Sequence, residues 1–257
     1  MTDADLSALI QIFSSDRPPR VWSLVVSLFG DFAQGTEAAI NSQHVNHVLT
    51  DIGIRPEAIR VALHRLRKEG WLHSDRQGRS SLYSLTEMGR KETLAAIPRI
   101  YDVPDSPEES WIVIHRPKTS FAEIADGYSI SPTVTLCTTK PDNPEAFTKQ
   151  ILHSDALPAW MFERLCKSEF VAQTSSTADR LKELQSTLSE IGPLNPHASI
   201  VLRVLVVHNW RRIALRAPAL PAYLFPDAWR GEECRALALG LLKKLPRPEL
   251  KQLGSPG

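Results

Sequence analysis

Positively charged side chains are concentrated in one part of the sequence, between Arg55 and Lys91. They are Arg55, Arg60, Arg65, Arg67, Lys68, Arg76, Arg79, Arg90 and Lys91. The whole chain has 30 lysines and arginines against 29 aspartates and glutamates, which gives a formal net charge of +1. Because a charged surface acts through the field near it and not through the total charge, this segment predicts a contact with an anionic partner.

The helix expected between Pro56 and Gly70 separates apolar from charged side chains. Helical spacing predicts a buried stripe of Ile59, Ala62, Leu63 and Leu66. The opposite face carries Glu57, Arg60, Val61, His64 and Lys68, with Arg65 and Arg67 at its edges. Arginine can bond bidentately to guanine and lysine can neutralise phosphate, so such a face suits a DNA major groove. Taken alone, the same pattern also fits an ordinary solvated helix surface.

A hairpin is expected directly after this helix. Residues 71–85 alternate as strands do, around a turn at Gln77 and Gly78. Basic side chains at its tip could follow the sugar–phosphate backbone or enter the minor groove. The candidate DNA contacts are Gln43, Arg60, His64, Arg65, Lys68, Arg76 and Arg79.

Two further helices precede the basic helix and one follows the hairpin. Pro18 and Pro19 lead into an apolar helix from Val21, and Asn41 or Ser42 can cap a second helix that ends at Gly53. Thr86 can cap an exit helix that ends near Pro98. Three helices followed by a hairpin is the order of elements in a winged helix-turn-helix, a DNA-binding fold. In that fold the basic helix would be the third helix, which lies next to the hairpin.

The remainder of the chain predicts an α+β fold with three domains. We expect a winged helix-turn-helix over 15–100, a small α+β middle domain over 108–155 and a helical C-terminal domain over 156–250. In the middle domain we expect strands near Trp111 and Val134, a short helix over 120–129 and another helix over 142–152. In the C-terminal domain we expect a capped amphipathic helix over 176–192 and two further helices.

The segment "HNWRR" places His208, Arg211 and Arg212 together on one of these helices. Two arginines could hold the phosphates of a coenzyme A ligand or bridge two subunits through carboxylates. Alternatively, the histidine makes a core contact and the arginines pair with acidic residues of the chain. We favour the structural or dimer interpretation over the ligand one.

No pattern in the sequence predicts catalytic residues, a metal site or a cofactor site. His44 and His47 are three residues apart, without further ligands near them in sequence. Cys137, Cys166 and Cys234 are scattered and odd in number, so we expect buried, reduced thiols and a cytoplasmic protein. No apolar run reaches the ~18 residues of a membrane helix, and the acidic start differs from a secretory signal.

Two long motifs resemble a known family. "VWSLVVSLFGDF", "IRVALHRLRKEGWLHSDRQGRSSLYSLTEMGR" and "RIYD" are similar to the N-terminal part of PaaX-type transcriptional repressors, which regulate bacterial phenylacetate catabolism. "VLVVHNWRRIALRAPALPAYLFPDAWRGEECRALALGLLKKL" resembles their C-terminal part. Residues 150–173 look shortened against the family pattern.

The resemblance implies a homodimeric repressor with a winged helix-turn-helix, a ferredoxin-like middle domain and a helical C-terminal domain that helps dimerisation. It also implies release from double-stranded operator DNA when a small effector of the acyl- or aryl-CoA thioester type binds, and control of aromatic-acid catabolic genes. Two alternatives stand beside it. One is an enzyme that acts on nucleic acid or CoA esters through the middle domain, and the other is a winged-helix module for a non-DNA partner, which would need an apolar outward face on the basic helix.

Overall fold

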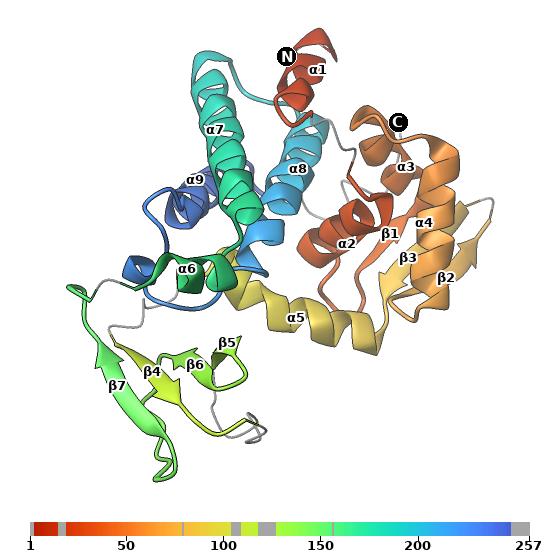
Figure 1. The fold of residues 1–257 in the computed structure, drawn as a ribbon. Coiled ribbons are helices and arrows are strands. Elements are labelled where there is room, and N and C mark those ends of the chain that lie inside the picture. The colour runs from red at the N-terminus through yellow and green to blue at the C-terminus, as the bar shows by residue number, and fades with distance from the viewer. Residues whose placement is uncertain are drawn as a thin grey trace. The chain divides into compact units, whose positions relative to one another are not determined.

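The structure is a computed structural model that describes residues 3–14, 19–78, 80–103, 109–117, 127–155 and 157–247. Contacts divide the chain into two compact units (Figure 1). Unit 1 comprises Met1–Asp102, Thr177–Leu215 and Glu233–Gly257, and unit 2 comprises Val103–Ser176 and Arg216–Glu232. The mixed α+β class is confirmed, because helices combine with two small antiparallel sheets.

Unit 1 contains the expected helices and hairpin together with three helices from the C-terminal part. In chain order they are α1 (Asp3–Gln11), α2 (Val21–Phe32), β1 (Ala39–Asn41), α3 (Ser42–Asp51), α4 (Pro56–Lys68), β2 (Leu72–Gln77), β3 (Ser80–Leu85), α5 (Glu87–Tyr101), most of α7 (Ser168–Glu190), α8 (Pro196–Ala214) and most of α9 (Gly231–Lys244). A small sheet has the strand order β1-β3-β2, all antiparallel.

Local sequence signals set the ends of these elements. The Asn41 side chain accepts a hydrogen bond from the Gln43 backbone N–H at 2.9 Å and so caps α3. Thr86 caps α5 in the same way through the Gly89 N–H at 3.0 Å. Gly78 adopts a positive φ of 59° at the hairpin tip, a conformation that costs glycine little.

Helix α8 is the central core element of unit 1. It packs on α1, α2, α3 and α5, and its residues Val201, Leu202, Val204 and Val206 have no exposed surface. Because it is apolar on nearly all sides, it must be surrounded by other elements. The basic segment of the chain is therefore built on a core to which the C-terminal part contributes.

Unit 2 contains a four-stranded antiparallel sheet with the order β5-β6-β4-β7. Its elements are β4 (Ser110–Ile114), β5 (Tyr128–Ser131), β6 (Val134–Cys137), β7 (Phe147–Ile151), α6 (Ala159–Leu165), the start of α7 and the short 3₁₀ helix η2 (Ala222–Leu224). The strands expected near Trp111 and Val134 are confirmed as β4 and β6. The short helix expected over 120–129 lies largely outside the described residues, and its end overlaps β5.

The helix expected over 142–152 is wrong, because residues 147–151 form strand β7. β7 pairs with β4 from Ser110↔Ile151 to Ile114↔Phe147. A helix at this place would leave the outer backbone edge of β4 without these partners, a cost that short-range helical spacing does not reveal. The helix expected to begin at Ser176 begins at Ser168 instead.

The three cysteines are free and buried, as expected. Burial raises the pKa of Cys166 to about 11, so its thiol stays protonated near neutral pH. Among the described residues, none of the helices combines the length and the hydrophobicity that a membrane crossing requires.

Candidate nucleic-acid interface

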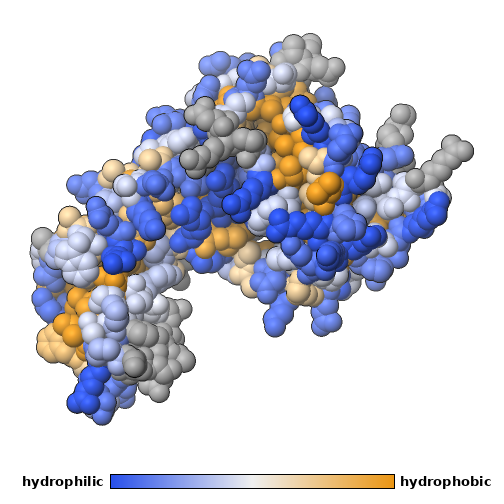
Figure 2. Space-filling model, turned by 45° about the vertical axis from the view of Figure 1, so that its right-hand side comes forward, coloured by the Kyte–Doolittle hydropathy of each residue, from blue (hydrophilic) through white to orange (hydrophobic). Residues whose placement is uncertain are grey.

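The two faces of α4 are as the helical spacing predicts. Ile59, Ala62, Leu63 and Leu66 are 0–5% exposed and form its buried stripe. Arg60, His64 and Lys68 are all exposed on the other side. Figure 1 shows α4 at the edge of unit 1 beside the β2–β3 hairpin, and Figure 2 turns that side forward, where hydrophilic side chains cover most of the surface.

One side chain on this outward face is apolar. Val61 is 68% exposed and lies between the basic residues in sequence. A single valine does not make the apolar face that docking of a non-DNA partner would need. An exposed aliphatic group among arginines is also compatible with a major groove, where it can contact a thymine methyl group.

Arg65 is held within the chain. Its Nε donates to the Glu69 carboxylate at 2.7 Å, and its guanidinium lies 5.5 Å from the ring centroid of Trp22. An exposed pair of this kind adds little stability, and it directs the guanidinium back toward α2. Arg65 is therefore better placed to fix the edge of α4 than Arg60 and His64, for which no such contact is seen within the described residues.

The hairpin contributes exposed polar groups near α4. The Arg67 Nη1 atom donates to Ser74 Oγ on β2 at 3.3 Å and so connects helix and hairpin. The Arg76 Nε atom lies 3.4 Å from the Gly78 carbonyl at the tip. Arg79, also a predicted DNA contact, lies outside the described residues.

The N-terminus of α3 is tied to the same hairpin. The Asn41 Nδ2 atom donates to Ser80 Oγ at 3.0 Å, and the Ser81 N–H donates to Ser42 Oγ at 3.3 Å. Gln43 follows on the first turn of α3 and is exposed. Strand β1, which no sequence pattern indicated, adds three backbone pairs to β3 at this place. The structure thus brings Gln43, α4 and the hairpin into one assembly.

Residues of the "HNWRR" segment lie in different environments. His208 is buried at 3% exposure, and its Nδ1 atom lies 3.3 Å from Ser27 Oγ on α2. Burial, together with the charges of Arg211 and Arg212, lowers the pKa of His208 to about 3. This placement supports the structural interpretation for His208. Arg211 is half-buried and Arg212 is exposed.

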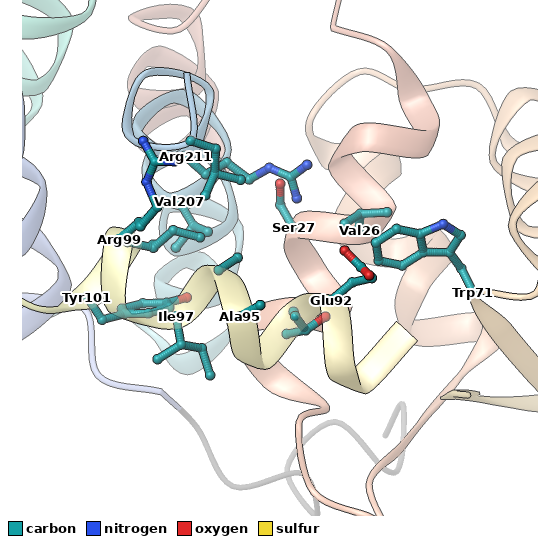
Figure 3. A pocket seen from close by; sticks show the side chains of 15 residues that line it. Val26, Ser27, Trp71, Glu92, Ala95, Ile97, Arg99, Tyr101, Val207 and Arg211 are labelled. Carbon is teal, nitrogen blue, oxygen red and sulfur yellow. The ribbon is translucent and has the colours of Figure 1, made fainter. Parts of the chain in front are cut away.

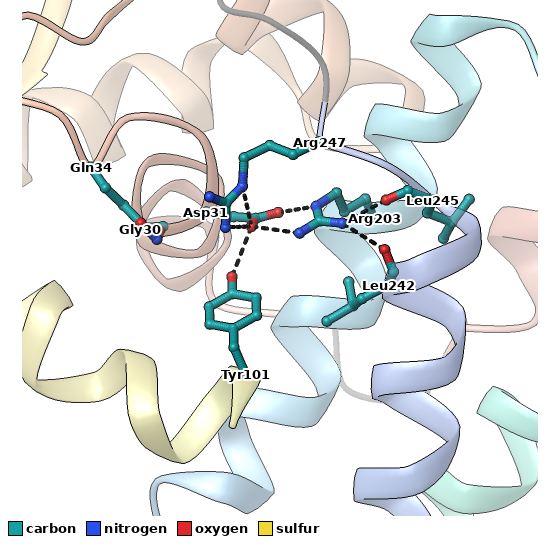
Figure 4. Close-up of polar contacts among 8 residues, drawn as sticks. All are labelled: Gly30, Asp31, Gln34, Tyr101, Arg203, Leu242, Leu245 and Arg247. Carbon is teal, nitrogen blue, oxygen red and sulfur yellow. Dashed lines mark hydrogen bonds and ion pairs between the residues drawn. The ribbon is translucent and has the colours of Figure 1, made fainter. Parts of the chain in front are cut away.

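A buried ion cluster, which sequence reasoning missed, holds α2 to the C-terminal helices (Figure 4). Asp31 is fully buried and accepts two bonds from Arg203, at 2.6 and 3.0 Å. Arg247 and the Tyr101 hydroxyl also donate to it, both at 2.8 Å. Arg203 in turn donates to the backbone carbonyls of Leu242 and Leu245. A sequence signal existed, since Asp31 follows the apolar run of α2 and Arg203 interrupts an apolar run of α8.

A second missed cluster lies between α3 and the start of α8. The His197 Nε2 atom lies 2.6 Å from Asp51 Oδ2, and the rings of His47 and His197 stack with centroids 3.9 Å apart. These three side chains bring ligand atoms within 4.8 Å of one another. Sequence spacing could not show this, because His197 is distant from α3 along the chain. The contacts join α3 to α8.

Comparisons with known proteins agree with the geometry. Residues 20–89 match the family described as PaaX-like protein, and residues 168–251 match the PaaX-like protein C-terminal domain. The transcriptional repressor PaaX of Escherichia coli (strain K12) is 27% identical over 268 residues, which span 93% of this chain and 85% of that protein. The structure of the uncharacterized protein Rv0674 from Mycobacterium tuberculosis aligns with 87% of this chain and with 96% of its own chain, at 18% identity. The TM-score of 0.45 is too low to assign a fold from this similarity. The two family matches, in this order along the chain, show that the chain belongs to the PaaX-like protein family.

Proposed function

We propose that this protein is a homodimeric repressor that binds double-stranded operator DNA through a winged helix-turn-helix made of α2, α3, α4 and the β2–β3 hairpin. The observation that carries the proposal is the outward face of α4. Arg60, His64 and Lys68 are exposed there, while the opposite stripe is anchored in the core. A helix held in this way can enter a major groove without losing its packing.

The expected contacts divide by role. Arg60 and His64 are assigned to base edges, where one bidentate contact discriminates by about 1–3 kcal/mol. Lys68, Arg76 and Arg79 are assigned to phosphates, which give affinity and salt dependence but no sequence preference. Gln43 at the exposed start of α3 is assigned to the same duplex, as is Arg65 at the edge of α4. A dimer would place two such helices in successive major grooves.

The remaining parts are assigned to control. We assign residues 15–100 to DNA binding, 108–155 to a ferredoxin-like middle domain and 156–250 to a helical region that helps dimerisation. The strand order β5-β6-β4-β7 supports the middle assignment, because the first and third strands are central, as in ferredoxin-like sheets. The described segment 138–146 departs from that pattern, since it contains no helix between β6 and β7.

The effector we propose is a small acyl- or aryl-CoA thioester, and the target genes are those of aromatic-acid catabolism. This follows the resemblance to PaaX-type repressors and the E. coli relative, which is a transcriptional repressor. Such a ligand can release DNA only if it binds the non-operator conformation more tightly than the operator-bound one.

Mobility shift on a duplex selected by the protein from a random pool tests the DNA-binding role. Arg60→Ala and His64→Ala should each weaken binding by about 5- to 150-fold, the range that 1–3 kcal/mol per base contact gives. Lys68→Ala should weaken all sequences alike and reduce the salt slope by about one. Lys182→Ala, an exposed lysine of α7, is the matched control and should bind as the wild type does. Unchanged affinity of both the Arg60 and the His64 variants would refute the assignment of α4 to the groove.

A further inference from the structure

A pocket of about 320 Å³ lies inside unit 1, between α2, α5 and α8 (Figure 3). Its walls are mostly aliphatic and include Val26, Ala95, Ala96, Ile97, Val207 and Leu215. This volume is at the lower end of the range for small-molecule sites, which are typically ~300–1,000 Å³. None of the DNA contacts proposed above lines the pocket, so that assignment leaves this space unexplained.

The charged group that distinguishes this pocket is Arg211. It is half-buried on α8, and no hydrogen bond or ion pair of its guanidinium is seen within the part of the chain that the structure describes. Burial lowers the pKa of Arg211, a charge on Tyr101 would raise it, and the charge of Arg212 lowers it again. The group stays protonated, because arginine titrates far above neutral pH. A half-buried cation without a partner gains when something anionic joins it.

The other polar groups of the pocket limit what can join it. In Figure 3 the guanidinium of Arg211 extends toward Ser27 and Val26, on the side of Glu92 and Trp71, whereas Arg99 of α5, which also lines the pocket, lies on the other side with Tyr101. A ligand with one anionic group fits this arrangement, with its charge toward Arg211 and an apolar body along the aliphatic walls. A whole CoA thioester is too large for the space, so only an acyl end could enter.

We propose that this pocket binds a small carboxylic acid with an apolar, ring-sized or branched body, whose carboxylate pairs with Arg211. The planar guanidinium presents donors in a fork that matches a carboxylate, which favours this anion over a spherical one. The acid would be a second ligand beside the CoA-type effector, so the inference goes beyond the proposed function.

The position of the pocket also allows a bound ligand to affect the DNA-binding surface through α2. This consequence rests on the proposed function. Val26, Ser27 and Gly30 of α2 form one wall, and α2 packs directly on α4. A ligand that changes how α2 packs on α8 would therefore change operator affinity. Binding is measured without DNA, so a failure of the pocket and a failure of the repressor assignment can be distinguished.

Calorimetry of the full-length chain with benzoate, cyclohexanecarboxylate and 3-methylbutanoate tests the proposal. At least one acid should bind saturably with one site per chain, and its neutral amide should bind at least 10-fold more weakly. Arg211→Met should weaken acid binding at least 10-fold, while Arg212→Met, which changes an exposed arginine of the same helix, should stay within twofold. Ala95→Phe should also abolish binding, because the phenyl ring would fill the pocket. Ala95 is exposed, so its position tolerates the larger side chain.

Thermal unfolding separates a ligand group from a structural one. Without ligand, Arg211→Met should melt at or above the wild-type temperature, because it removes a half-buried charge for which no partner is seen within the described residues. A lower melting temperature or a failure to fold would assign Arg211 to the fold and overturn the proposal. The proposal would also be overturned if none of the three acids bound, or if Arg211→Met or Ala95→Phe bound an acid as tightly as the wild type does. Binding of benzoyl-CoA in the pocket without binding of benzoate would overturn it as well.

Discussion

Leu63 and Val61 are neighbours on α4 that face in opposite directions. Leu63 is 3% exposed and Val61 is 68% exposed. Leu63→Ala should lower the free energy of unfolding by about 2–5 kcal/mol, because it leaves a cavity in the core. Val61→Ala should change it by less than about 0.5 kcal/mol. Urea denaturation of both variants measures this, and an equal effect of the two would contradict the orientation of the helix.

His208 should make the protein sensitive to mild acid. Its folded-state pKa of about 3 is below the 6.5 of the unfolded chain. The stability that comes from keeping it neutral is therefore complete above pH 6.5 and is lost as the pH falls toward 3, at about 1.4 kcal/mol per unit. His208→Asn should show a flatter pH profile of urea midpoints between pH 7 and 5. Parallel profiles of variant and wild type would show that His208 does not carry this dependence.

At the residue scale, the sequence predicted which way a side chain faces better than what it contacts. Ile59, Leu63 and Leu66 are buried as the 3.6-residue period requires. The period gives no information on contacts between distant segments. It therefore missed the position of Trp22 beside Arg65 and the position of Ser27 beside His208. Both contacts depend on how helices pack on one another, which a single sequence does not encode locally.

The Asp31 cluster acts between elements, because it joins α2 to α8 and α9. The side chain of Asp31 has no exposed surface, and that of Arg203 is 6% exposed. Asp31→Asn should cost about 3–5 kcal/mol of stability, since it leaves the Arg203 charge buried without a carboxylate. Asp31→Leu combined with Arg203→Met should recover most of that loss. Arg247→Ala should cost less than about 1 kcal/mol, because Arg247 is 41% exposed.

A double-mutant cycle of Asp31→Leu, Arg203→Met and the double variant, followed by thermal or urea unfolding, measures the coupling, with Asp31→Asn measured beside it. The decisive result is the sign of the coupling between Asp31 and Arg203. If the double variant were as unstable as the two single losses added together, the two side chains would not act as a pair, and α2 would be held to α8 by apolar packing alone.

At the element scale, local signals predicted most of unit 1 and failed in unit 2. The caps at Asn41 and Thr86 and the turn at Gly78 act within a few residues, so they are legible in the sequence. Strand β7 exists because β4 offers an unpaired edge, and the two strands are separated by a long segment. Residues 147–151 carry no short-range signal of that distant partner, and helical spacing therefore predicted the wrong element.

At the scale of the whole molecule, the arrangement of α8 could not be predicted from the order of segments. The sequence predicted a helical C-terminal domain over 156–250 that is separate from the DNA-binding part, a division that stays a prediction. Contacts of the described residues nevertheless group α8 with α2, α3 and α5 in unit 1. Covariation between distant positions could reveal such packing, but hydrophobic periodicity along one chain cannot.

This packing determines how the proposed dimer can be tested. A chain that ends at Pro193 would lack α8 and α9, and with them Val201, Leu202 and Trp210, all at most 1% exposed. We expect it to lose cooperative unfolding in circular dichroism, because α2 would be left without its main partner and Asp31 without Arg203. Loss of dimers in that chain would then report misfolding. A chain 1–193 that unfolds cooperatively would contradict the shared core, and the dimer itself should be sought by sedimentation of the full-length protein, where a monomer at all concentrations would refute it.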